Sequence, residues 1–436
     1  MKCYPLTRDI YGSLRGYRRC AIRRAAREAL HAHPATIMQR AEHLFLQRYQ
    51  EAQATFPRYA QQVAHNDGHP PILSKTDIQH ILANHTPNKG DIPHATGGST
   101  GQPLRFYITR ESYEWRTAVS DRGYSYAQAE EGQRSFYVWG APIAKPTFLQ
   151  QIKTSLHHWL QNRHYFNSFQ FDEAQMARCC AQINRFKPVS LVGYAGNLVA
   201  LVQFVARHPH LLTWRARTAV TAAEGLPPSM REIIEQHLAQ EVFMSYGSRE
   251  FMLIGMETPE HDGYQIAADN VYVEVVDSEG NPCPPGVAGD ILVTDLHNTA
   301  TPFIRYKIGD VGVMAPTNDQ QFPKLARVDG RSQEVIIHAD GSKTTALFFP
   351  HLMKDFPSVQ GYQIAQLTNG YICMHIITDI PNWQADHDRI RKLILQHVGS
   401  DIQIDFKKVD RLYKTPSGKT PIVLPIEYLS SPRDYT

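Results

Sequence analysis

Strand-like and helical segments alternate between residues 134 and 247, and this alternation restricts the fold more than any other feature of the chain. Apolar runs typical of buried strands occupy residues 135–139, 189–192, 217–222 and 242–245. Helical patterns lie between them at residues 172–186, 198–206 and 227–239, with Asp172 a suitable N-cap for the first. Because strands that return through a helix make right-handed crossovers, the sequence predicts an α/β fold around a parallel sheet.

Two further regions follow this α/β part. Valines alternate with polar residues from 271 to 275, and a strand-like run returns at 290–294, which predicts an antiparallel β subdomain. Strand, helix and strand patterns at 371–377, 386–397 and 402–406 predict a small α+β domain. We expect an N-terminal core of residues 1–330, made of a helical cap (1–65), an α/β part (66–250) and the β subdomain (251–330), and a mobile C-terminal lid domain of residues 331–436.

The predicted helical cap is basic. Six arginines crowd one segment: Arg15, Arg18, Arg19, Arg23, Arg24 and Arg27. A solvated face is the simpler interpretation, and contact with an anionic membrane or an acidic carrier protein is the alternative.

Composition restricts the class of protein. Lys and Arg number 45 against 42 Asp and Glu, a net charge of +3 without long runs of one sign, so nothing favours a nucleic-acid surface. The six cysteines form no CxxC pair, which favours neither a zinc site nor a disulfide framework. No apolar run reaches the roughly 18 residues of a membrane span. We expect a cytoplasmic protein without a transmembrane segment.

A glycine-rich stretch precedes the alternating strands and helices and suggests an anion site. It consists of Thr96, Gly97, Gly98, Ser99, Thr100 and Gly101. Glycines let backbone N–H groups converge on an anion, and the hydroxyls add donors. The stretch lacks the lysine and the following helix of a Walker loop, because residues 104–108 are strand-like. The alternative is a glycine-rich surface turn.

Four further motifs occur in a fixed order after this stretch. They are Tyr246-Gly247-Ser248-Arg249-Glu250, Arg305-Tyr306-Lys307-Ile308-Gly309-Asp310, Asp329-Gly330-Arg331 and Ser417-Gly418-Lys419. Together with the glycine stretch they resemble the adenylate-forming superfamily of acyl-CoA synthetases and adenylation domains. The likeness covers roughly residues 70–422 and is closest to the branch of phenylacetate–CoA ligases, coenzyme F390 synthetases and CapK-type proteins.

The resemblance implies an ATP-dependent acid–thiol ligase. A carboxylate attacks the α-phosphate of ATP to give an acyl-adenylate and pyrophosphate, and the acyl group then passes to coenzyme A or to the phosphopantetheine of an acyl carrier protein. Mg²⁺ would accompany the phosphates. The resemblance also allows two alternatives: transfer of AMP or GMP to a hydroxyl, and a weakly catalytic nucleotide-binding protein in polysaccharide assembly. A homodimer is a further expectation from the family.

Residue roles follow from the same resemblance. Thr96–Gly101 would hold the β- and γ-phosphates, although Gln102 stands near the place of a usual lysine. Tyr246 would stack on adenine, with Gly247 and Ser248 beside it, and Glu250 would bind Mg²⁺. Arg249 replaces the usual threonine and would either contact phosphate or pair with Glu250. Asp310 would accept the ribose hydroxyls, and further nucleotide contacts are expected from Glu224, Gly225, Arg305 and Arg331. The alternatives are an ordinary turn for Asp310, a polar strand end for Glu224, and structural ion pairs for Arg305 and Arg331.

Lys419 is the residue expected to carry adenylation, because a mobile cation can meet the charge that develops at the α-phosphate. A solvated loop lysine is the alternative. Residues 330–333 would form a hinge between the two domains. Trp139, Tyr194 and Gly196 are the predicted substrate-binding residues, with Tyr124 and Tyr126 less favoured. An aromatic lining suits an aryl or unsaturated acid, although such aromatics can equally belong to the core.

Overall fold

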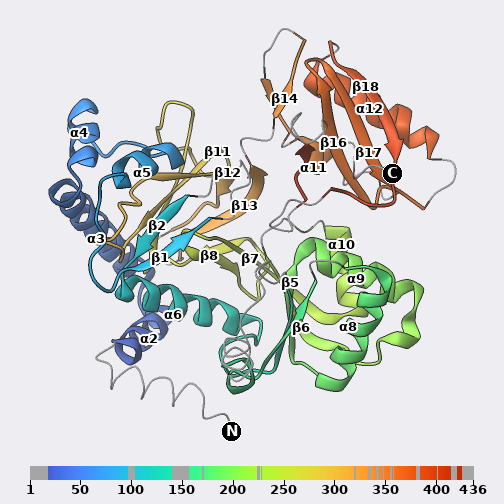
Figure 1. The fold of residues 1–436 in the computed structure, drawn as a ribbon, viewed down its shortest axis with the longest axis horizontal. Helices are drawn as coiled ribbons and strands as arrows, with labels where there is room; N and C mark the ends of the chain where they lie inside the picture. The colour runs from blue at the N-terminus through green and yellow to red at the C-terminus, as the bar shows by residue number, and fades with distance from the viewer. Residues whose placement is uncertain are drawn as a thin grey trace. The chain divides into compact units, whose positions relative to one another are not determined.

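The computed structural model describes residues 18–96, 104–139, 157–168, 171–222, 226, 228–318, 321–331, 335–339, 343–346, 348–353, 356, 358–379, 383–399, 401–413 and 420–424. The chain divides into two compact units at residues 328 and 329 (Figure 1). Among the described residues, no helix has the length and apolarity to cross a membrane.

Eleven strands form one mixed sheet in the order β10-β11-β12-β13-β9-β8-β7-β6-β5-β3-β4. Their bounds are β3 Ser135–Trp139, β4 Arg163–Asn167, β5 Ser190–Tyr194, β6 Ala216–Ala222, β7 Ala239–Ser248, β8 Met252–Glu257, β9 Tyr264–Ile266, β10 Val271–Val276, β11 Ala288–Asp295, β12 Tyr306–Met314 and β13 Lys324–Arg331.

The half of the sheet that contains β4, β3, β5, β6 and β7 is parallel, which confirms the predicted α/β fold class. Its crossover helices are α8 (Glu173–Phe186), α9 (Ala195–Arg207) and α10 (Pro228–His237), and their apolar residues share one core with β3, β5 and β6. Asp172 caps α8, since its Oδ1 accepts a hydrogen bond from the Gln175 backbone N–H.

The other half of the sheet is built mainly from antiparallel pairs, as the alternating valines predicted. These strands continue the parallel sheet instead of forming a sheet of their own. The reason is the ten-residue length of β7, which pairs with β6 up to Ser245 and turns to β8 from Ser245 onward. The carboxyl edge of the parallel strands therefore adjoins the antiparallel half.

N-terminal elements pack beside this sheet. They are α2 (Arg19–Glu28), the 3₁₀ turn η1 (Ala29–His31), α3 (Pro34–Thr55), α4 (Pro57–His65), α5 (Lys75–Leu82), the hairpin of β1 (Ile92–Ala95) and β2 (Arg105–Ile108), and α6 (Arg110–Tyr126). A second 3₁₀ turn, η2 (Pro209–Leu211), follows α9. Apolar residues of α3, α4 and α5 join the core of the antiparallel half.

Two arginines of the predicted basic face point inward, which corrects the expectation that these arginines are solvated. Arg19 is buried between Glu114 and Glu131, and Arg23 pairs with Asp121 of α6 at 2.9 Å. Buried charges require such partners. The ion pairs fix α2 on α6, and Arg18, Arg24 and Arg27 remain exposed.

The C-terminal unit has a four-stranded sheet in the order β18-β17-β16-β19. Its elements are the hairpin β14 (Val335–Ile337) and β15 (Lys343–Thr345), α11 (Phe348–Met353), β16 (Gly361–Thr368), β17 (Tyr371–Ile377), α12 (Gln384–Val398), β18 (Gln403–Lys408) and β19 (Val423–Leu424). Apolar residues of both helices and all four strands form one core. The predicted strand, helix and strand correspond to β17, α12 and β18.

Candidate active site

The glycine-rich stretch lies between the two strands of the β1–β2 hairpin. Thr96, its first residue, closes the base of the hairpin: its N–H donates to the Leu104 carbonyl, and its Oγ1 accepts from the Leu104 N–H at 2.9 Å. Gly97, Gly98, Ser99, Thr100, Gly101 and Gln102 lie outside the described residues. The described geometry therefore fixes the point from which the stretch leaves the hairpin.

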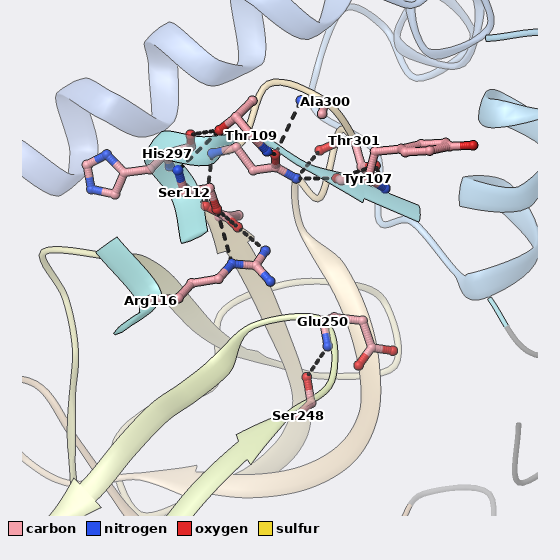
Figure 2. Close-up of polar contacts among 11 residues, drawn as sticks. Tyr107, Thr109, Ser112, Arg116, Ser248, Glu250, His297, Ala300 and Thr301 are labelled. Carbon is pink, nitrogen blue, oxygen red and sulfur yellow. Dashed lines mark hydrogen bonds and ion pairs between the residues drawn. The ribbon is translucent and has the colours of Figure 1, made fainter. Parts of the chain in front are cut away.

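A turn between β11 and β12 anchors this hairpin (Figure 2). The Thr301 hydroxyl accepts from the Tyr107 N–H at 3.0 Å and donates to the Tyr107 carbonyl at 2.9 Å. Asn298 bonds the same carbonyl through Nδ2 and accepts the Thr109 N–H through Oδ1. Three hydrogen bonds thus tie β2, and a fourth ties Thr109 just after it, to the chain segment that leads into β12.

Asp295 organises the turn from within the protein. Its Oδ1 accepts the backbone N–H groups of His297 and Asn298, and its Oδ2 accepts from the side chains of Ser112 and Arg116. Arg116 is 1% exposed, and Figure 2 shows its guanidinium directed into this polar cluster. The buried ion pair locks α6, the turn and the hairpin together, because each buried charge needs its partner.

Tyr246 and Asp310 come from different motifs and are in direct contact. Tyr246 is the first residue of β7 beyond its pairing with β6, and Asp310 lies on β12. The Tyr246 hydroxyl donates to Asp310 Oδ2 at 2.9 Å. The ring of Tyr246 is largely buried and lies 6.1 Å from the ring of Tyr264. An aromatic ring and a carboxylate thus share one position beside the carboxyl edge of the parallel strands.

Glycine is required at position 247. A Cβ there would lie 1.9 Å from the Met252 carbonyl oxygen, because β7 is irregular between Tyr246 and Gly247 as it approaches β8. The Ser248 hydroxyl then accepts the backbone N–H of Glu250 at 3.2 Å (Figure 2). These contacts set the conformation of the turn that presents Arg249 and Glu250.

Glu250 is half-buried, and its Oε1 accepts from the hydroxyl of Tyr306 at 3.5 Å. Tyr306 was not assigned a role from the sequence, although its motif was recognised. No group of three or more His, Cys, Asp or Glu residues is placed to hold a metal within the described ranges. Glu250 is therefore a single carboxylate that suits Mg²⁺ only if phosphate oxygens supply further ligands.

Arg249 is exposed on the same turn. Its side chain forms no ion pair with Glu250 among the described residues. Burial lowers the pKa of His94, and the nearby positive charges of Arg116 and Arg249 lower it further. His94 precedes the glycine-rich stretch on β1, so the charge of Arg249 acts at the base of this stretch.

Arg305 forms the structural ion pair that was the alternative to a nucleotide contact. Its guanidinium pairs with Glu274 at 3.2 Å and donates to the carbonyls of Pro70 and Gly280. Its backbone adopts a left-handed φ of 46°.

Four other predicted positions cannot be placed in the site. Glu224, Gly225 and Lys419 lie outside the described residues, and Arg331 ends β13 with its side chain outside them.

Trp139 and Tyr194 lie together at the carboxyl edge of the parallel strands. They end β3 and β5, and their rings stack with centroids 4.2 Å apart. Gly196 follows in the first turn of α9. Asn197 was not singled out from the sequence. It is 4% exposed, and its amide donates to the Ser168 hydroxyl at 2.7 Å. Tyr124 and Tyr126 pack in the same aromatic cluster as Trp139.

Comparisons with known proteins identify relatives of this chain. The AMP-binding enzyme family matches residues 93–300, and the CapK C-terminal domain matches residues 336–425. Phenylacetate-coenzyme A ligase of Pseudomonas putida is 26% identical over 56% of this chain and 55% of the ligase, so that match spans about half of the relative. Protein CapK of Staphylococcus aureus is 24% identical over 80% of this chain and 78% of CapK.

A solved structure shows the same fold. 2-Hydroxyisobutyryl-CoA ligase, in complex with its acyl-adenylate, matches 91% of this chain and 91% of its own, with a TM-score of 0.68 and 16% sequence identity.

Proposed function

Because this chain belongs to the adenylate-forming superfamily, in its phenylacetate-CoA ligase and CapK-like branch, we propose that it joins a carboxylic acid to a thiol at the expense of ATP. The carboxylate oxygen bonds to the α-phosphorus of ATP and pyrophosphate leaves. The thiol sulfur then bonds to the acyl carbon and AMP leaves. Coenzyme A or a phosphopantetheine arm is the thiol.

The contact between Tyr246 and Asp310 is the observation that carries this proposal. A ring beside a carboxylate suits a nucleoside, because the ring packs on adenine and two carboxylate oxygens match two adjacent ribose hydroxyls. Thr96 and Arg249 would contact the phosphates, and Glu250 would hold Mg²⁺, which would neutralise phosphate charge. Lys419 would meet the charge that develops at the α-phosphate during attack.

The stacked pair of Trp139 and Tyr194 supports an aryl or unsaturated acid as substrate. A flat, apolar acid packs well against aromatic ring faces. The polar groups of a polar acid would lack hydrogen-bond partners there. Gly196 lies in the helical turn beside them and leaves backbone within reach of the substrate carboxylate.

Exchange of labelled pyrophosphate into ATP tests the proposal. The full chain is assayed with a panel of aryl and alkenyl acids, beside Lys419→Ala and the exposed-lysine control Lys408→Ala. We expect exchange that requires an acid, with a loss of about 100- to 1,000-fold in Lys419→Ala and little change in the control, since one transition-state contact contributes about 3–4 kcal/mol.

Three outcomes would contradict parts of the proposal. Undiminished exchange in Lys419→Ala would reject the lysine. A stable nucleotide adduct of a hydroxyl acceptor would support nucleotidyl transfer instead. ATP binding without exchange for any acid would favour the weakly catalytic alternative.

A further inference from the structure

A wholly buried glutamine in the C-terminal unit joins both flanks of the segment that contains Lys419. Gln363 lies on β16 and is 0% exposed. Its Nε2 donates to the carbonyl oxygens of Tyr413 at 3.2 Å and Pro421 at 2.8 Å, and its Oε1 accepts the Tyr413 N–H at 2.9 Å. Tyr413 precedes residues 414–419 and Pro421 follows them, so one amide bridges the two ends.

The sheet strengthens the second flank. The Ile364 N–H donates to the Ile422 carbonyl at 2.7 Å, and β19 pairs with β16 through Ile364 and Val423. The chain therefore leaves and rejoins the sheet at neighbouring residues of one strand. A buried amide is costly unless its hydrogen bonds are made, and here both donors and the acceptor of Gln363 have partners.

We propose that Gln363 is a positioning residue for Lys419, because it fixes the two points between which the lysine is held. The inference rests on the proposed function for the role of Lys419, but the bridge itself does not. Without the amide, the Tyr413 flank loses two hydrogen bonds and the Pro421 flank loses one. The lysine would then sample more positions, and fewer of them would meet the α-phosphate.

Gln366 offers a matched control on the same strand. It is 2% exposed, donates to the carbonyls of Ile337, Thr368 and Tyr371, and accepts the Ile337 N–H. It is therefore a buried glutamine with a similar number of backbone partners, and none of these partners flanks residues 414–419. Loss of either side chain removes comparable hydrogen bonds, but only Gln363 bridges the flanks of Lys419.

The test compares Gln363→Met with Gln366→Met in the full chain, each also combined with Lys419→Ala. We expect Gln363→Met to lower the maximal rate of pyrophosphate exchange by about 10- to 100-fold, as a displacement of about 1 Å does, with the KM for ATP nearly unchanged. Gln366→Met should lower the unfolding temperature to a similar extent but leave that rate within a few-fold of wild type. In the Lys419→Ala background, Gln363→Met should cause no further loss.

A second measurement needs no activity. Trypsin cleavage after Lys414 and Lys419 of the native protein should be faster in Gln363→Met and in Gln363→Glu than in wild type and Gln366→Met. Cleavage and exchange rates that are unchanged in the Gln363 variants would overturn the inference. So would a loss of exchange activity in Gln363→Met that multiplies with the loss caused by Lys419→Ala. If the Gln363 variants are cleaved faster but Lys419→Ala leaves pyrophosphate exchange unchanged, the bridge by Gln363 is supported and the proposed role of Lys419 is rejected.

Discussion

Arg249 supplies an exposed positive charge beside the proposed phosphate site. It is exposed, and it lies near enough to His94 to lower the pKa of that imidazole. We expect Arg249→Gln to raise the KM for ATP by about 10- to 100-fold, since a hydrogen bond to a charged group contributes about 1.5–3 kcal/mol. Steady-state exchange kinetics over a range of ATP concentrations measure this change.

Arg27→Gln is the control for this change, because Arg27 is an exposed arginine on α2. The difference in the KM for ATP between wild type and Arg249→Gln should shrink as the salt concentration rises, since screening weakens attraction between exposed charges. An unaltered KM for ATP in Arg249→Gln would show that the guanidinium does not contact phosphate, and the positive charge at this site would need another source.

Motif residues were accessible from the sequence, but their partners were not. Tyr246, Glu250 and Asp310 belong to short patterns with recognisable spacing. Glu250 contacts Tyr306 on β12. The hairpin depends on Asp295, which lies 179 residues from its partner Arg116. Such pairings arise only when distant strands and helices come together, and no local composition records them. Arg305 shows the same limit, because its partner Glu274 lies on another strand.

The β1–β2 hairpin is the element that carries the glycine-rich stretch, and Thr301 holds it. Thr301 is wholly buried and exchanges two hydrogen bonds with the Tyr107 backbone. We expect Thr301→Val to lower the free energy of unfolding by about 1–3 kcal/mol, because the Tyr107 N–H loses its partner. The KM for ATP should rise by about tenfold if the hairpin shifts by an amount that costs about 1.4 kcal/mol in binding.

Thr117→Val is the matched control, since the Thr117 hydroxyl donates only to the Tyr113 carbonyl within α6. Thermal unfolding and ATP titration of both variants separate a general loss of stability from a loss at the hairpin. Equal KM values for ATP in the two variants would mean that docking through Thr301 does not position the phosphate-binding residues.

Elements with a strong pattern were predicted, and several strands without one were missed, among them β4 and β16. β4 begins with Arg-His-Tyr and has one buried residue, so it lacks the apolar run of an interior strand. β16 contains the buried Gln363 and Gln366, which break its apolar alternation. Gln363 is satisfied by backbone groups 50 and 58 residues away, and Gln366 is satisfied in part by Ile337, 29 residues away. This compensation cannot be recognised in the sequence of the strand itself.

At the scale of the whole molecule, each unit holds a histidine whose protonation should affect stability. His297 stacks on Trp115 in the first unit, and His375 lies on β17 in the second. Burial lowers the pKa of both, and the charge of Lys407 lowers that of His375 further. The unfolded chain therefore binds protons before the native protein does, so stability falls as pH drops below the ordinary value of about 6.5.

This predicts an acid-sensitive transition in each unit, because two units need not unfold together. Between pH 7.5 and 5.5, where carboxylates stay ionised, each histidine should lower the free energy of unfolding by at most about 1.4 kcal/mol. His375→Gln should reduce the pH dependence of one calorimetric transition and His297→Gln that of the other, whereas the exposed His43→Gln should change neither. If both transitions keep their full pH dependence in the two variants, other groups cause the acid sensitivity. If both variants alter one single transition, the two units unfold together.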